Sequence, residues 1–185
     1  MTYFTITETK QKTSEIIAKM RKLFDVYSFY DDKQLDKDFP PPKQISTRHF
    51  AKNIEADEEY KNMSANDLDE KGVKGITLRE RLLMEIQYFK ETGNHLDVDN
   101  VTLCSGSRDS GGDVPSVYWD SARRGVYVDW GGLSRSYSSL RARVAVNPLT
   151  LSSLVPSATG DSIDLITRVG NLESDMHKIK KFLII

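Results

Sequence analysis

The stretch ITLRERLLMEIQYFKETGN, residues 76–94, carries the most complete helix signature in the chain. Thr77, followed three residues later by Glu80, forms a capping box, and Gly93 supplies the left-handed residue that commonly ends a helix. The apolar residues between these signals recur at helical spacing and form the expected buried face: Leu78, Leu82, Ile86 and Phe89. We therefore expect a helix between Thr77 and Gly93 that packs one side against a core.

Short segments rich in β-branched and aromatic residues follow this helix, with turns rich in Asp, Ser and Gly between them: residues 100–104, 114–119, 125–130 and 140–146. A helix followed by closely spaced strands is typical of an α+β fold, in which a small antiparallel sheet carries the helix on one face. We expect residues 76–147 to form this domain.

The chain before this domain divides into two parts. The pattern of residues 1–35 predicts a strand followed by an amphipathic helix. Residues 13–14 cap this helix, which ends near residues 31–33. Residues 36–75 include three consecutive prolines at 40–42, which cannot join a helix, and then a polar, acidic stretch. We expect this second part to be a long loop.

The bulk composition limits the classes of function. The 185 residues include 26 basic and 27 acidic side chains, so the net charge of -1 attracts the chain neither to nucleic acid nor to anionic membranes. Cys104 is the single cysteine, which excludes an internal disulfide and favours a reducing compartment. The N-terminal residues do not read as a signal peptide, and no apolar run approaches the ~18 residues that a membrane span needs. We expect a soluble, cytoplasmic protein.

The C-terminal segment, residues 161–185, shows a heptad pattern. Its apolar residues are spaced alternately by four and three positions: Leu165, Val169, Leu172, Met176, Ile179 and Leu183. The flanking charges would pair with opposite sign in a parallel, in-register coiled coil: Arg168 with Glu173, and Asp175 with Lys180. We therefore expect a short parallel coiled coil between copies of the chain, after a linker at residues 148–160. The competing interpretation is a helix that packs on its own domain.

The order of the expected oligomer follows from the width of the apolar seam. Ile166 and Phe182 add apolar surface beside the core heptad positions, which favours a trimer or tetramer over a dimer. Each exposed charge pair contributes only ~0.3–0.5 kcal/mol, so we expect the pairs to set the register of the helices and not their stability.

The stretch RDSGGDVP, residues 108–115, copies the core of the nucleophile loop of chymotrypsin-like proteases. We interpret it as a hairpin connection, because a serine nucleophile needs a histidine base and an orienting acid from other parts of a larger fold. A phosphate-binding loop formed by GSRDSGG, residues 106–112, with Arg108, is a second interpretation, although no helix follows. The enzymatic alternative uses Cys104 or Ser110 with His95. We expect no catalytic residue, metal site or cofactor.

Arginine and aromatic residues concentrate in the second half of the predicted sheet. Such a surface suits a protein interface, and it also suits single-stranded nucleic acid. A third interpretation gives this surface no binding role: the sheet has a charged outer face, and its aromatic residues belong to the core. The residues that we expect to contact a partner are Arg123, Arg124, Arg141, Arg143 and Trp130.

The block from ITLRERLLMEIQYFKETGNHLD through VTLCSGSRDS to VYVDW and LRARVAV, residues 75–146, resembles uncharacterised small proteins of bacteriophages and prophages. The resemblance implies a phage-encoded factor that acts on a host protein, and it implies no catalytic residues. We predict a non-enzymatic, homo-oligomeric protein that binds another macromolecule, and we expect this macromolecule to be a protein. Nucleic-acid binding and a small enzyme are the alternatives.

Overall fold

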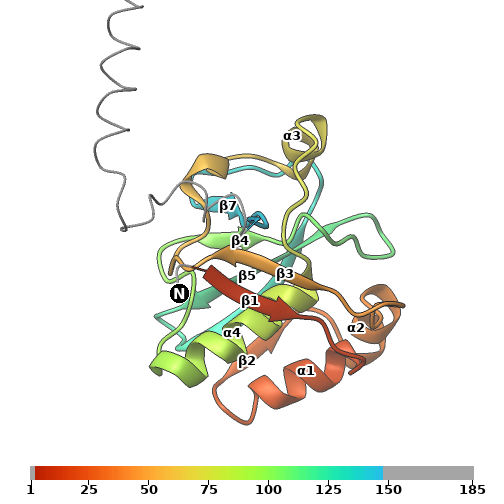
Figure 1. Cartoon of the computed structure of the whole chain (residues 1–185), viewed down its shortest axis with the longest axis vertical. Helices are drawn as coiled ribbons and strands as arrows, with labels where there is room; N and C mark the ends of the chain where they lie inside the picture. Colours follow the sequence, from red (N-terminus) through yellow and green to blue (C-terminus); the bar gives the residue numbers. More distant parts are fainter. Residues whose placement is uncertain (1–2, 148–185) are drawn as a thin grey trace, which may run out of the picture. The chain divides into compact units, whose positions relative to one another are not determined.

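The computed structural model describes residues 3–147 of the chain (Figure 1). The predicted linker and coiled coil, residues 148–160 and 161–185, lie outside the described residues. The elements follow in the order β1 (Tyr3–Thr7), α1 (Thr13–Met20), β2 (Val26–Ser28), α2 (Asp32–Asp38), β3 (Thr47–Ala51), the 3-10 helix η1 (Glu58–Tyr60), α3 (Ala65–Glu70), α4 (Leu78–Thr92), β4 (Val101–Leu103), β5 (Val114–Asp120), β6 (Gly125–Gly131) and β7 (Leu140–Ala142).

The predicted α+β class is confirmed, but the sheet is mixed and not antiparallel. Its order is β2-β6-β5-β4-β7; β2 runs parallel to β6, and β7 runs parallel to β4. The strands β4, β5 and β6 are consecutive in the chain and pair antiparallel, as short connections require. The two parallel strands reach the sheet through long stretches of chain, so no tight turn sets their direction.

A second, two-stranded sheet pairs β1 with β3 in antiparallel register. The residues after β7 connect it to the larger sheet, because Val144 bridges Gly75 and Ala145 bridges Phe50. The N–H of Val146 then donates to the carbonyl of His49 at 2.7 Å. The stretch predicted as one strand at 140–146 therefore contacts both sheets: β7 pairs with β4, and the residues after it pair with β3.

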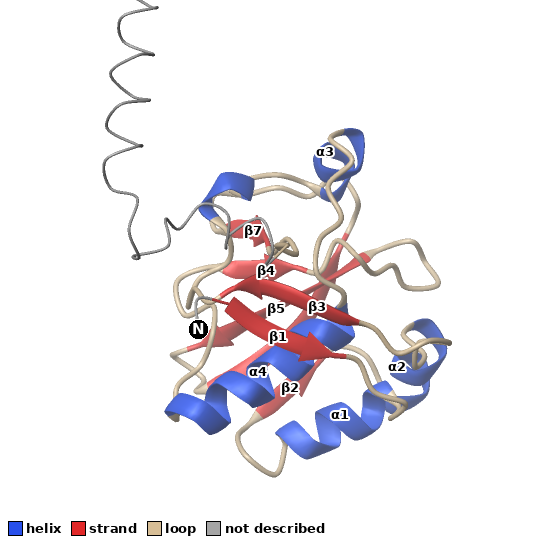
Figure 2. Cartoon of the chain, in the orientation of Figure 1, coloured by secondary structure: helices blue, strands red, loops and turns tan. Residues whose placement is uncertain are grey.

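Helix α4 has the ends that the sequence predicts, and it lies between the two sheets (Figure 2). Thr77 and Glu80 form the capping box, and Gly93 ends the helix with a φ of 70°. The helix contacts β1, β5 and α1, so it is enclosed on more than the single face predicted. Even charged residues of this helix are therefore buried, including Arg81 and Glu85 at 0% exposure.

The N-terminal prediction is wrong after Met20. Helix α1 ends there, where the sequence predicted that it would continue to about residue 31. Leu23 and Phe24 keep helical spacing, but the β-branched and aromatic run that follows pairs with β6 as strand β2. A second helix, α2, then begins directly after Asp31. The Asp31 carboxylate caps it by accepting from the N–H of Gln34 at 2.8 Å.

The region 36–75 is more ordered than predicted. It contains the end of α2, strand β3, η1 and helix α3. Helix α3 begins with a capping box in which the Ser64 hydroxyl and the Asp67 carboxylate satisfy each other's backbone N–H groups. The sequence pattern did not predict these elements, because the region is polar and each element is short and buries few side chains.

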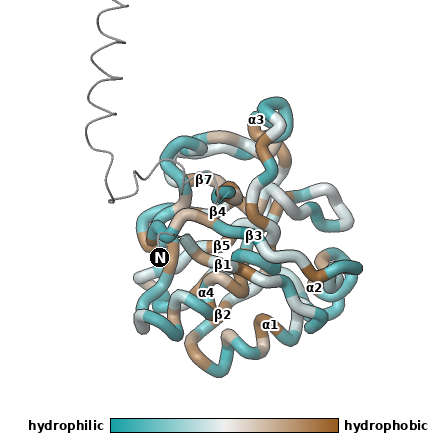
Figure 3. Tube along the Cα trace, in the orientation of Figure 1, coloured by the Kyte–Doolittle hydropathy of each residue, from teal (hydrophilic) through white to brown (hydrophobic). Residues whose placement is uncertain are grey.

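The two faces of the five-stranded sheet are covered unequally. Helices α4 and α1 pack on one face, where they share a hydrophobic core with β2, β5 and β6. Brown, hydrophobic stretches of the chain occur where α4, β1 and β5 are labelled in Figure 3. On the other face, Ala65 and Leu68 of α3 pack only over β4, β7 and the start of β5. No helix among residues 3–147 packs over the remainder of this face, which β2, β6 and the end of β5 form.

Candidate functional site

Strand β2 is the open edge of the five-stranded sheet, and no strand among the described residues lies beyond it. The carbonyl of Asp25 accepts from β6 at 2.9 Å, and the N–H of Phe29 donates to β6 at 3.0 Å. Because backbone groups of alternate residues point to opposite sides of a strand, Tyr27 also faces β6, whereas Val26 and Ser28 direct their N–H and C=O groups outward. This edge is a template for another strand.

Exposed apolar side chains gather on and beside this edge. Leu23, Tyr27 and Phe29 are 39%, 44% and 64% exposed. A hollow of about 480 Å³ lies against the strand and is lined by Arg21, Val26, Tyr27, Ser28, Phe29 and Tyr127. Since the lining includes every residue of β2, the open space runs along the edge itself.

A row of tyrosines crosses the uncovered half of the sheet next to the edge. The Tyr27 and Tyr127 rings stack with centroids 4.9 Å apart, and the Tyr127 and Tyr118 rings stack at 5.5 Å. Centroids this close place the rings face to face across neighbouring strands, not flat on the sheet. The stack therefore supports Tyr27 from behind and leaves its outer side exposed at β2.

The turn between β5 and β6 lies against this row. The guanidinium carbon of Arg123 lies 5.7 Å from the centre of the Tyr127 ring, and its Nη1 donates to Asp120 at 2.9 Å. Backbone and side-chain hydrogen bonds from Arg123 lower the pKa of Asp120 below its ordinary value. Of the residues predicted to contact a partner, Arg123 and Arg124 are exposed beside the tyrosine row.

The other three predicted contact residues do not join this surface. Arg143 is 1% exposed and belongs to a buried network, so it is not available as a surface contact. The Arg141 side chain is 13% exposed and forms an ion pair with Glu58. Trp130 is 45% exposed, but it follows Arg124 by six residues along β6, roughly 20 Å along an extended strand. Arg141 and Arg143 are covered because η1 and the segment after β3 lie on their side of the chain: Arg141 pairs with Glu58, and Arg143 donates to the carbonyls of Asn53 and Ile54.

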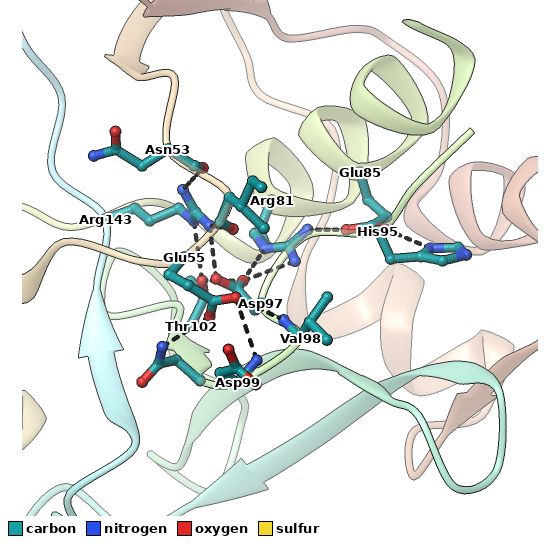
Figure 4. A network of polar contacts seen from close by, with 12 residues as sticks. Asn53, Glu55, Arg81, Glu85, His95, Asp97, Val98, Asp99, Thr102 and Arg143 are labelled. Atoms are coloured by element: carbon teal, nitrogen blue, oxygen red, sulfur yellow. Dashed lines mark hydrogen bonds and ion pairs between the residues drawn. The ribbon is translucent and has the colours of Figure 1, made fainter. Parts of the chain in front are cut away.

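The buried network that contains Arg143 was not predicted (Figure 4). The Asp97 carboxylate accepts from Arg81 Nε at 2.9 Å and from Arg143 Nη2 at 2.6 Å. Arg81 Nη1 also donates to Glu85 at 2.7 Å, and the other oxygen of Glu85 lies 2.9 Å from Nδ1 of His95. The carboxylates and guanidiniums therefore balance each other inside the protein, as buried charges require.

This network joins elements that are distant in the sequence. Asp97 also accepts from the Thr102 hydroxyl of β4, and Arg143 donates to the carbonyls of Asn53 and Ile54 after β3. Burial acts to raise the pKa of Asp97, but the Arg143 and Arg81 guanidiniums outweigh it, so the pKa lies below the ordinary value. The network holds α4, β4 and the segment after β3 together, and this role is structural.

The groups of the enzymatic alternative are each engaged elsewhere. The His95 ring stacks on Trp119 with centroids 3.7 Å apart, and its Nδ1 contacts Glu85. Cys104 is fully buried, and burial raises the pKa of its thiol. Ser110 Oγ donates to Asp38 at 3.3 Å. This arrangement gives neither nucleophile a hydrogen bond to the histidine.

The DSGG loop connects β4 to β5 as predicted. The Asp109 carboxylate accepts from the N–H groups of Gly111 and Asp113, both at 2.9 Å, and from the Tyr30 hydroxyl at 3.3 Å. Gly112 has a φ of 87°, which favours glycine. Pro115 follows the loop in the interior strand β5, between β4 and β6.

A second hollow, of about 280 Å³, lies near the first turn of α4 and includes Ser107 of the suggested phosphate-binding loop. Its two arginines already face carboxylates: Arg79 Nε donates to Glu8 at 3.1 Å, and Arg108 Nη2 donates to Asp69 at 2.8 Å. Burial raises the pKa of Glu8 above its ordinary value, although Arg79 acts in the opposite direction. Neither arginine offers the hollow an uncompensated charge for phosphate.

Comparison with protein-family models, with curated proteins and with solved structures finds no match to the chain. The resemblance of residues 75–146 to phage proteins stays a prediction. Within residues 3–147, no group of three or more His, Cys, Asp or Glu side chains could hold a metal ion, and no helix there is long and apolar enough to cross a membrane. The predicted oligomerisation residues, Leu165 to Leu183 with their flanking charges, lie outside the described part of the chain.

Proposed function

We propose that the protein is a non-enzymatic binding protein that holds an extended segment of another protein as an added strand along β2. One observation carries the proposal: the outward N–H and C=O groups of Val26 and Ser28 border a hollow of about 480 Å³. Phe29, 64% exposed, lines the same hollow. Hydrogen bonds to an edge provide affinity in this mode of recognition, and pockets for alternate side chains provide specificity.

The other ends of the two sheets are less suited to strand addition. The outer side of β7 is occupied, because the N–H groups of Asp57 and Asn62 donate to Ala142 and Leu140 at 3.0 and 2.8 Å. In β1, Phe4 and Ile6 are buried at 1% and 2% exposure, so its large aliphatic and aromatic surface already belongs to the core. β2 is the edge at which backbone groups, apolar side chains and open space coincide.

Single-stranded nucleic acid is the alternative partner, and the tyrosine row argues against it. Bases stack on exposed ring faces. Here the faces of Tyr127 lie against Tyr27 and Tyr118, and Tyr127 is only 9% exposed. Arg141 and Arg143, which would have contacted phosphates, are paired with carboxylates. The surface therefore favours a polypeptide that uses backbone hydrogen bonds.

Oligomerisation through residues 161–185 remains part of the proposal. A three-residue edge offers few hydrogen bonds, each with a net contribution of about 0.5–1.5 kcal/mol. Several such sites joined in one oligomer would bind a multivalent partner more tightly through avidity.

Matched substitutions at Ser28 test the proposal. Both Ser28→Pro and Ser28→Ala remove the hydroxyl that bonds with Tyr30. Only proline removes the outward N–H, at an edge position where the sheet itself tolerates proline. Octapeptides enriched from a random display library on the full chain would be synthesised with a fluorescent label, and their Kd measured by anisotropy.

We expect the Kd for these peptides to be at least about tenfold higher with Ser28→Pro than with Ser28→Ala, which corresponds to the loss of about 1.4 kcal/mol. Urea denaturation of both variants verifies that each remains folded. Equal affinities in two folded variants, or a library from which no peptide is enriched, would overturn the proposal.

A further inference from the structure

Arg124 occupies a backbone conformation that its residue type does not favour. Its φ is 52°, in the left-handed region, at the end of the turn between β5 and β6. The other described non-glycine residues with positive φ are Asn62 and Asp97, and both types adopt this conformation more readily than arginine does. Glycine would satisfy the backbone of this turn better than arginine.

The side chain of Arg124 contributes nothing visible to the fold. It is exposed, and it makes no hydrogen bond or ion pair with any residue between 3 and 147. Its neighbour Arg123 differs, because that guanidinium bonds to Asp120 and lies over Tyr127. A residue that strains the backbone without a compensating contact inside the protein indicates a contact outside it.

The position of Arg124 connects it with the β2 edge. Gly125, the next residue, lies so close to Tyr27 that a Cβ atom there would come within 2.5 Å of the tyrosine ring. In the ladder Val26 pairs with Val126, so Arg124 stands beside the beginning of β2. A strand added along β2 would lie on the far side of β2 from β6, so the side chain of Arg124 would have to extend past the beginning of β2 to meet it.

Other charges border the same path. Arg21 lines the hollow, with its Nη1 at 3.9 Å from Asp32 on the surface. Asp25 is exposed at the beginning of β2, and no ion pair joins it to Arg124. Arg124 is thus a cation near the beginning of β2 that has no counter-charge among the described residues.

We propose that Arg124 binds a carboxylate of the segment that β2 holds, so that the protein selects apolar, extended segments with an aspartate or glutamate near the end that pairs with Val26. The inference rests on the proposed function. A guanidinium suits this role, because its N–H groups match the two oxygens of a carboxylate.

Arg124→Gly tests the inference, because it relieves the backbone and removes the guanidinium together. We expect the melting temperature of the full chain to rise by about 1–4 °C. The Kd for the enriched octapeptides should rise about tenfold, as expected for the loss of a charge-assisted contact. Against the same peptides with glutamine or asparagine in place of the acid, wild type and variant should bind equally. Asn62→Gly is the matched control, since it changes the backbone at a φ of 58° away from β2 and should leave peptide affinity unchanged.

The outcomes separate this inference from the function on which it rests. If the enriched peptides lack acidic residues, or if Arg124→Gly binds them as wild type does while Ser28→Pro does not, only the role of Arg124 is overturned. If Ser28→Pro binds as Ser28→Ala does, the site at β2 itself is overturned, and the role of Arg124 with it.

Discussion

Replacing Asp97 with asparagine removes one negative charge from the interior and leaves the shape of the side chain unchanged. Asparagine also tolerates the left-handed backbone at this position, where φ is 54°. The carboxylate lies 2.9 and 2.8 Å from two nitrogens of Arg81 and 2.6 Å from Arg143. All three side chains are at most 1% exposed. In Asp97→Asn, the amide N–H₂ faces one of the two guanidiniums, the negative charge between them is gone, and Glu85 is the carboxylate that remains beside Arg81.

The expected loss of stability is large. Removing one partner from a buried ion pair costs about 3–5 kcal/mol, because the remaining charge is left uncompensated in the interior. A domain of this size unfolds with a free energy of about 5–15 kcal/mol, so the variant should lose at least about a fifth of it. With a urea m-value of about 1.5–2 kcal/mol/M, the midpoint of unfolding should fall by roughly 1.5–3 M.

The pH dependence gives an independent readout. The pKa of Asp97 lies below its ordinary value in the folded protein, so the stability from its charge is fully present above about pH 4. This contribution is lost as the pH falls through the lower, folded pKa. The difference in unfolding free energy between wild type and Asp97→Asn should therefore narrow in acid.

Urea denaturation followed by tryptophan fluorescence measures both effects, because Trp119 stacks on His95 beside the network. Asp99→Asn is the control: the same chemical change is made two residues away at an exposed side chain, and we expect a change below about 0.5 kcal/mol. A loss below about 1 kcal/mol for Asp97→Asn, or a difference from wild type that does not change with pH, would refute the reasoning.

Three further predictions concern the edge, the thiol and the tail. Phe29→Ser should weaken binding of the enriched octapeptides at least tenfold and leave the urea midpoint nearly unchanged, because Phe29 is 64% exposed; Ile45→Ser, at a residue 49% exposed, should affect neither. The Cys104 thiol should react with an aromatic disulfide reagent at pH 8 only after unfolding, because burial raises its pKa; rapid reaction of the native protein would contradict this. Sedimentation should show a trimer or tetramer for the full chain and a smaller mass for a chain that stops at Gly160, whereas equal monomeric masses would contradict the predicted coiled coil.

The parts of the fold that the sequence predicts are those with local signals. The capping box at Thr77 and the glycine at Gly93 define α4 because both act within a few residues of the helix ends. The strands β4, β5 and β6 follow from local composition and short turns, and the loop at residues 108–113 follows from its own side-chain contacts.

The parts that the sequence did not predict depend on distant partners. The buried network joins Arg81, Asp97 and Arg143, and nothing local indicates that these charges meet. Arg143 was therefore predicted as a surface contact, although it and Arg141 lie on the same side of the chain as Thr102, which faces the interior.

The candidate site was predicted only in part. Arg123 and Arg124 lie on it, but the edge itself was assigned to a helix, because Leu23 and Phe24 continue the spacing of α1. The run Val26-Tyr27-Ser28 is rich enough in β-branched and aromatic character to have indicated a strand. The direction of β2 and its place at the edge depend on β6, about a hundred residues later in the chain.

Amide hydrogen exchange at Val26 and Ser28 tests the account most directly, since their N–H groups point away from the sheet in the free protein. With saturating enriched octapeptide, we expect exchange at both amides to slow at least tenfold, as strand pairing requires. A peptide that binds the full chain and leaves exchange at both amides unchanged would contradict strand addition at β2.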